Sequence, residues 1–128
     1  MRKFIASTIY IFSFFSIFCQ NPTWNKVDSL LTESFNEFTK FQFIESVLLA
    51  DSALQLATSN NYSTGKIISN IYIVKVLVEI GLDMEALRHL QNLTGESQLK
   101  NRIDYQVEIH RLKGKIYGNQ KLYALARN

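Results

Sequence analysis

Apolar residues recur every three or four positions from Val27 onward, and this spacing constrains the fold more than any other feature of the sequence. The alternation of apolar and polar residues that marks a half-buried strand never persists. With one Pro and five Gly in 128 residues, the chain also has few points at which a helix must break. We therefore expect an all-α protein with five helices and the start of a sixth, the five at residues 27–39, 43–57, 66–79, 84–93 and 101–117.

The helical pattern repeats when the chain is aligned with itself at an offset of 40, the separation of Val27 from Ile67. Three sets of positions then coincide: Val27, Ile67 and Val107; Ser34, Val74 and Gly114; and Ser46, Ala86 and Ala126. A helix pair cannot bury its apolar face alone, so neighbouring pairs must stack, with small residues where helices cross. We expect a short α-solenoid of antiparallel helix pairs over residues 25–128, with about 2.5 repeats. Its last pair is incomplete, which should leave an exposed apolar patch near the C-terminus.

Gly114, Tyr117, Tyr123 and Ala126 have the small–aromatic–aromatic–Ala spacing of the tetratricopeptide repeat (TPR), and residues 25–128 resemble that family. The same frame is found in the two earlier units, at Leu77, Gly81, Ala86 and Leu90 and at Ser34, Phe43, Ser46, Ala50 and Ala53. The sequence departs from the family in having Asp83 at an aromatic position and a period longer than the usual ~34 residues. The resemblance implies a non-enzymatic module that binds a protein or peptide.

The run from Phe43 to Ala53 has a narrower resemblance, to the exported repeat region of certain bacterial regulators. In those proteins a signal segment and TPRs precede a membrane helix and a DNA-binding domain of the AraC type, and some sensor kinases share the front half. The resemblance implies sensing or protein interaction, with no nucleic acid contacted by this chain. The alternative function is therefore that of a truncated sensor portion of a membrane-anchored AraC-type transcriptional regulator or histidine kinase.

The first nineteen residues have the form of a targeting segment. A cationic start, Arg2-Lys3, precedes an uncharged, mostly apolar run from Phe4 to Phe18. Such a run is typical of a secretory signal and is shorter than the roughly 20 residues of a spanning helix. We expect residues 1–19 to be a signal peptide or an uncleaved membrane anchor, and the protein to be periplasmic or membrane-anchored in a bacterium. Cys19, the only cysteine, leaves lipidation as a further alternative and excludes an internal disulfide.

The remaining chemistry of the sequence gives no sign of an active site. His89 and His110 are the only histidines and have no ligand spacing around them, so we expect no metal. We find no phosphate-binding Gly-rich loop and no nucleophile motif, and we expect neither a cofactor nor catalytic residues. The formal charge of +3 is small for a nucleic-acid-binding protein. The seven basic residues from Lys100 onward are either a patch for an acidic partner or a solvated helix face.

The resemblance also implies where a partner would bind, because the first helix of each TPR pair lines the concave groove. The implied positions are Asp28, Leu31, Phe35 and Phe38, then Ile68, Ile71, Lys75, Val78 and Glu79, then Glu108, Arg111 and Lys115. We expect the polar residues Lys75, Glu79, Glu108, Arg111 and Lys115 to form the peptide-binding groove, with the cations suited to an acidic peptide or a C-terminal carboxylate. Alternatively, Lys75 and Glu79 merely pair with each other on one helix surface.

Overall fold

The computed structural model describes residues 21–127, and the predicted targeting segment with Cys19 lies outside them. Within this range the chain is entirely helical, without a strand, which confirms the expected all-α class. Its elements are α2 (Pro22–Thr39), α3 (Phe43–Ser59), α4 (Ser63–Glu79), α5 (Asp83–Leu93), the 3-10 turn η1 (Ser97–Asn101) and α6 (Ile103–Arg127). Helix α2 begins earlier than predicted because Pro22 occupies its first position and the Asn21 side chain accepts a hydrogen bond from the Thr23 amide at 3.0 Å.

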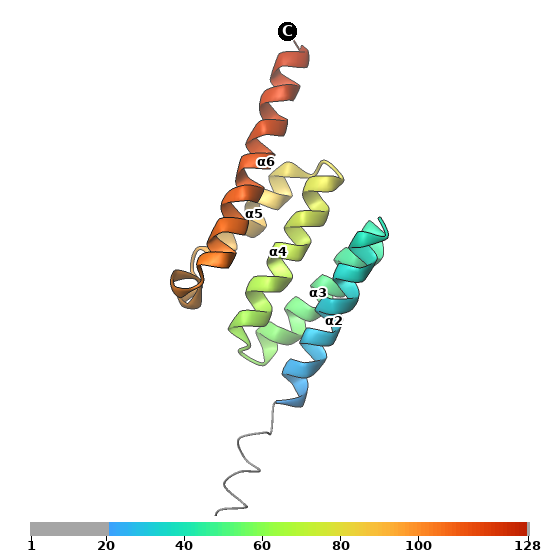
Figure 1. Cartoon of the computed structure of the whole chain (residues 1–128), viewed down its shortest axis with the longest axis vertical. Coiled ribbons are helices and arrows are strands. Elements are labelled where there is room, and N and C mark those ends of the chain that lie inside the picture. The colour runs from blue at the N-terminus through green and yellow to red at the C-terminus, as the bar shows by residue number, and fades with distance from the viewer. Residues whose placement is uncertain (1–20, 128) are drawn as a thin grey trace, which may run out of the picture.

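The helices are arranged in two layers (Figure 1). Helices α2, α4 and α6, the first helices of successive pairs, lie side by side, and α4 contacts both of the others. Helix α3 lies against α2 and α4, and α5 lies against α4 and α6. Each helix therefore buries a face against the next helix along the chain, so the apolar surface that no pair could cover alone is covered by its neighbour.

Three nearly identical turns, evenly spaced along the chain, set this arrangement. Their central residues Phe41, Asn61 and Gly81 have left-handed backbone conformations, with φ of 62°, 52° and 82°. After each, an amide N–H donates to a carbonyl five residues back: Gln42 to Glu37 at 2.9 Å, Tyr62 to Ala57 at 2.9 Å, and Leu82 to Leu77 at 2.8 Å. This is the Schellman pattern, which ends a helix by satisfying its last carbonyls. Helix α2 is separated from α4 by two turns of this evenly spaced series. This spacing produces the offset of 40 residues between Val27 and Ile67.

Small residues occupy the helix crossings. Ala50, Ala53 and Ala57 of α3 are fully buried, as is Ala86 of α5. Between α2 and α3, the buried hydroxyls of Ser34 and Ser46 each donate to the other residue's backbone carbonyl, at 2.8 and 2.9 Å. Both polar groups are thus satisfied inside the packed layer, and the two backbones can approach closely. Larger residues fill the main core between α4, α5 and α6, among them Ile67, Val74, Leu90, Leu112 and Ile116.

The expected register is wrong in the last part of the chain. Val107 was expected to match Ile67 but is 61% exposed, and Ile109, two positions later, is buried instead. The match to Val74 shifts in the same way, from Gly114 to the buried Ile116. The start of α6 keeps the expected offset, because the six residues that α5 lacks relative to α4 are made up by the longer connection through η1. The shift therefore lies in which face of α6 packs against α4 and α5.

The expected start of a sixth helix is also wrong, because α6 runs without a break from Ile103 to Arg127. A sixth helix would require the chain to break after Tyr117, where Gly118 is the residue that favours a break. Among residues 21–127 the positive-φ positions are Phe41, Asn61 and Gly81, so Gly118 continues the helix rather than ending it. The segment has no Pro and includes the good helix formers Gln120, Lys121 and Leu122, so the last helix extends beyond the part that packs against the core. The side chain of Ala126 lies outside the described residues.

The two glycines give a direct test of this assignment. Gly81→Ala should destabilise the fold by about 1–2 kcal/mol, because the added Cβ is strained in the left-handed conformation. Gly118→Ala should stabilise it by about 0.5–1 kcal/mol, because the added methyl meets nothing within 4 Å and lowers the entropy of the unfolded chain. Urea unfolding followed by circular dichroism measures both. A destabilising Gly118→Ala would contradict a continuous α6.

Candidate functional site

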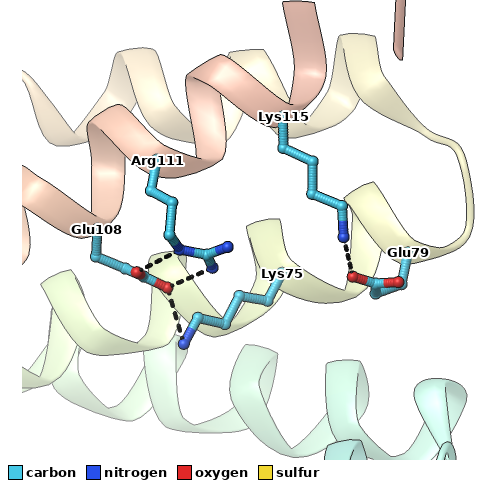
Figure 2. A network of polar contacts seen from close by, with 5 residues as sticks. All are labelled: Lys75, Glu79, Glu108, Arg111 and Lys115. Carbon is cyan, nitrogen blue, oxygen red and sulfur yellow. Dashed lines mark hydrogen bonds and ion pairs between the residues drawn. The ribbon is translucent and has the colours of Figure 1, made fainter. Parts of the chain in front are cut away.

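The five predicted groove residues lie together where α4 and α6 run side by side (Figure 2). Lys75 and Glu79 project from α4, and Glu108, Arg111 and Lys115 project from α6. The spacings of three and four residues place each set on one helix face, and the packing of α6 on α4 brings the two faces opposite each other. The sequence thus indicated the members of this cluster, which we call the α4–α6 polar cluster.

The charges of the α4–α6 polar cluster pair across the two helices. The Glu108 carboxylate accepts two hydrogen bonds from Arg111, at 2.8 and 2.9 Å, and pairs with the Lys75 ammonium at 3.0 Å (Figure 2). The Lys115 ammonium pairs with Glu79. The alternative of a Lys75–Glu79 pair on one helix surface is therefore wrong. Each of these residues finds its partner on α6 instead, because α6 packs alongside α4 and places charges of opposite sign beside both.

The pairing determines the protonation of Glu108. The bidentate hydrogen bonds from Arg111, together with the nearby Lys75 ammonium, lower the pKa of Glu108 to about 2. The same hydrogen bonds raise the pKa of Arg111. Glu108 is therefore ionised at any ordinary pH, and the cluster has three cations and two carboxylates. This leaves one positive charge in excess, with the Arg111 side chain 55% exposed to solvent.

Aromatic residues adjoin the cluster on the side of α2. The Tyr72 ring lies 5.6 Å from the Lys75 ammonium and 6.0 Å from the Phe35 ring. Phe35 is exposed, as a contact residue for a partner would be. A crevice between Phe35, Tyr72, Lys75 and Ser34 is too narrow to admit a water molecule, so it is packing rather than a ligand pocket. The aromatic pair nevertheless extends the surface of the first helices from α6 to α2.

Several apolar residues predicted for the groove belong to the core instead. Leu31, Ile71 and Val78 are each only 4% exposed. Ile71 and Val78 pack in the cluster between α4, α5 and α6, and Leu31 packs with Val27 against the alanines of α3. The reason is that a helix in a two-layer stack buries much of its circumference, so only part of the inner face is left to solvent. Asp28 accepts a hydrogen bond from the Tyr62 hydroxyl at 3.0 Å and so contributes to the contact between α2 and α4.

Sequence reasoning missed a hollow at the other side of the cluster. It has a volume of about 450 Å³ and lies between the α4–α5 turn and the far half of α6, beside the Glu79–Lys115 pair. Its lining includes Gly81, Asn119, Leu122 and Tyr123. The packing explains the hollow, because Leu122 and Tyr123 follow the buried Ile116 by six and seven residues and extend beyond the core. As predicted, apolar residues are exposed near the C-terminus: Tyr117, Leu122, Tyr123 and Leu125 all lie more than half in solvent, and Leu122 and Tyr123 line the hollow.

His89 lies on α5 and His110 on α6. Among residues 21–127, no three side chains of His, Cys, Asp or Glu are grouped to hold a metal ion. His89 is partly buried, and its Nδ1 atom lies 3.1 Å from the Asn70 side-chain oxygen. This burial lowers the pKa of His89. The neutral ring is thus a packed, hydrogen-bonded element of the contact between α4 and α5.

Comparisons with protein families, with curated proteins and with solved structures find no match for this chain. None of the helices in residues 21–127 combines the length and the apolar character needed to span a bilayer. The functional assignment therefore depends on the surface itself.

The Glu108 interactions predict a specific dependence of stability on pH. Because the pKa of Glu108 falls from 4.5 to about 2 on folding, its ion pairs stabilise the fold above pH 4.5. That contribution is lost as the pH falls toward 2. The difference in melting temperature between the wild type and Glu108→Gln should therefore be largest near neutrality and shrink below pH 4.5, as measured by circular dichroism. Glu33→Gln is the matched control, since Glu33 makes no ion pair within residues 21–127. An equal trend in both variants would refute the assignment.

Proposed function

We propose that this protein is a non-enzymatic, TPR-type interaction module that acts after export and binds a protein or peptide on the face of its first helices. The observation that supports this most directly is the single layer formed by α2, α4 and α6, with the α4–α6 polar cluster exposed between two of them. Equal turns and small residues at the crossings are what a TPR-type stack requires. The targeting form of residues 1–19 supports export.

The chemistry of the surface favours an acidic ligand. The α4–α6 polar cluster has an excess of one positive charge, and the guanidinium of Arg111 can donate further hydrogen bonds besides the two to Glu108. Charge-assisted hydrogen bonds to a carboxylate are the strong ones, and Arg offers a planar fork for them. The adjacent hollow of about 450 Å³, with Leu122 and Tyr123 in its lining, would accept an apolar side chain next to that carboxylate. A peptide ending in an apolar residue with a free C-terminus combines both features.

A sensor portion of a membrane-anchored regulator or kinase is the alternative, and it would use the same surface. Sensing by such a module is itself the binding of a protein or peptide, so the two functions share one experiment on the ligand. They differ in what the bound module controls, which would be found from the genes that respond to its deletion.

The groove prediction is tested with a library of acidic peptides, offered with free and with amidated C-termini. Replacing Arg111 and Lys115 together by Ala should weaken the selected peptide's binding by about tenfold or more, since hydrogen bonds to charged groups contribute about 1.5–3 kcal/mol each. The matched control is the Lys40→Ala/Arg88→Ala pair, which removes two exposed cations that also form ion pairs. Binding is measured by calorimetry at low and high salt. If both double variants bind equally well, the α4–α6 polar cluster is not the site.

Export is tested separately, with a reporter fused after Gln20. An alkaline phosphatase reporter, active only outside the cytoplasm, should be active, because a cationic start and an apolar run direct a chain to secretion. Changing Arg2 and Lys3 to Glu is the control and should reduce the activity. An inactive reporter that stays soluble in the cytoplasm would exclude the proposed location without bearing on the groove.

A further inference from the structure

The two ends of the stack have net charges of opposite sign. Between Pro22 and Ser59, the pair α2 and α3 with their turn carries five acidic residues and two basic ones. The middle pair, α4 and α5, has three of each sign, and α6 has two acidic and five basic residues. The molecule is therefore polar along its stacking direction, acidic at the α2–α3 end and basic at α6.

The basic end has an apolar stripe that no described residue covers. Ile103, Val107, Tyr117 and Leu125 are all exposed, Ile103 by 75%. In a helix of 3.6 residues per turn, Val107 and Leu125 lie on the side of α6 opposite the buried Ile116, since each is nine positions from it, or two and a half turns. Ile103 lies near that side, and Tyr117, which follows Ile116, lies on the flank between the two sides. Lys113 and Lys121 lie one turn before and after Tyr117, and neither forms an ion pair within residues 21–127.

The acidic end has a groove of complementary character. It lies between α2 and α3, has a volume of about 400 Å³, and is lined by Glu33, Glu37, Glu45, Leu48, Leu49 and Ser52. Glu33 and Glu37 are on the side of α2 away from Asp28 and Phe35, which contact α4. The groove therefore faces away from the rest of the stack. Leu48 is 61% exposed, and Glu33 and Glu45 have no ion-pair partner in the described range.

We propose that copies of this chain associate head to tail, with the apolar stripe of α6 from one copy seated in the acidic α2–α3 groove of the next. The contact would pair Tyr117 and Val107 with the exposed Leu48, and Lys113 and Lys121 with Glu33 and Glu45. It repeats a packing already present within the chain, since α6 is held by its other face against the pair α4 and α5. A second copy is the occupant that the charges indicate, because the two uncovered surfaces of one chain have opposite signs.

Such a contact is heterologous, because it joins two different surfaces. It need not stop at a dimer, and successive copies would extend the stack in one direction or close into a ring. Two copies joined stripe to stripe would instead bring Lys113 and Lys121 of one copy near the same lysines of the other. The inference is independent of the peptide groove, which involves Arg111 and Lys115 on a different face of α6.

The test is a charge exchange in the full-length chain, followed by sedimentation velocity over a concentration series. Variant A is Glu33→Lys/Glu45→Lys, and variant B is Lys113→Glu/Lys121→Glu. The wild type should associate beyond a dimer and less so at high salt. Each variant alone should associate at least tenfold more weakly, because like charges would then face each other. An equimolar mixture of A and B should recover the association, since both the native and the exchanged contacts are then of opposite charge.

Three outcomes would overturn the proposal: a wild type that stays monomeric at all concentrations, a variant A that associates like the wild type, or a folded mixture that fails to recover. The second outcome would indicate pairing through α6 or through the apolar N-terminal segment, which both variants retain. Folding is checked by circular dichroism. Should a reversal prevent folding, Glu33→Gln/Glu45→Gln replaces variant A, and it should weaken the association without abolishing it.

Discussion

The left-handed turn that recurs at equal intervals along the chain is the constraint on which the rest of the structure depends. At Phe41, Asn61 and Gly81 the backbone reverses in the same conformation and the same hydrogen bonds close each helix. Because these three reversals have the same geometry, α3, α4 and α5 are each returned alongside the helix before them. Helix α6 follows the longer connection through η1 and completes the layer of first helices by packing on α4. A bulky Phe in a left-handed conformation is uncommon, and its presence at the first turn shows that the packing of α2 on α3 stabilises a turn that the local sequence does not favour.

The candidate site follows from that layer. Helices α4 and α6 lie close enough for Lys75 to pair with Glu108, and for Lys115 to pair with Glu79, so the charges that face solvent are also contacts between helices. Exposed pairs of this kind contribute little to stability individually, about 0–1 kcal/mol. Their arrangement nevertheless fixes the orientation of the Arg111 guanidinium, which is held by two hydrogen bonds to Glu108 and remains open on its outer side. A partner would thus meet a cation that is already positioned.

At each end of the described stack, one helix face is not covered by a further helix pair. A face that an internal helix buries against its neighbour is, at an end, available to another molecule. Here the two open faces differ in sign, with carboxylates around Leu48 and lysines around Tyr117. Net charge arranged in this way influences which surfaces meet and how fast they associate more than it influences the fold. Variants that change these charges should therefore alter the proposed association more than the fold.

The sequence by itself determined the all-helical class, the positions of α3, α4 and α5 to within about three residues, and the small residues at the crossings, because these depend on local spacing and residue size. It also indicated the members of the α4–α6 polar cluster, since residues three or four apart share a helix face. Only the tertiary structure decided that Ile109 rather than Val107 is buried, that α6 continues through Gly118, and that Lys75 pairs across to α6 rather than with Glu79. Those outcomes depend on which face of α6 packs against α4 and α5. That choice is made by contacts among helices far apart in the sequence, and no periodicity within one helix can reveal it.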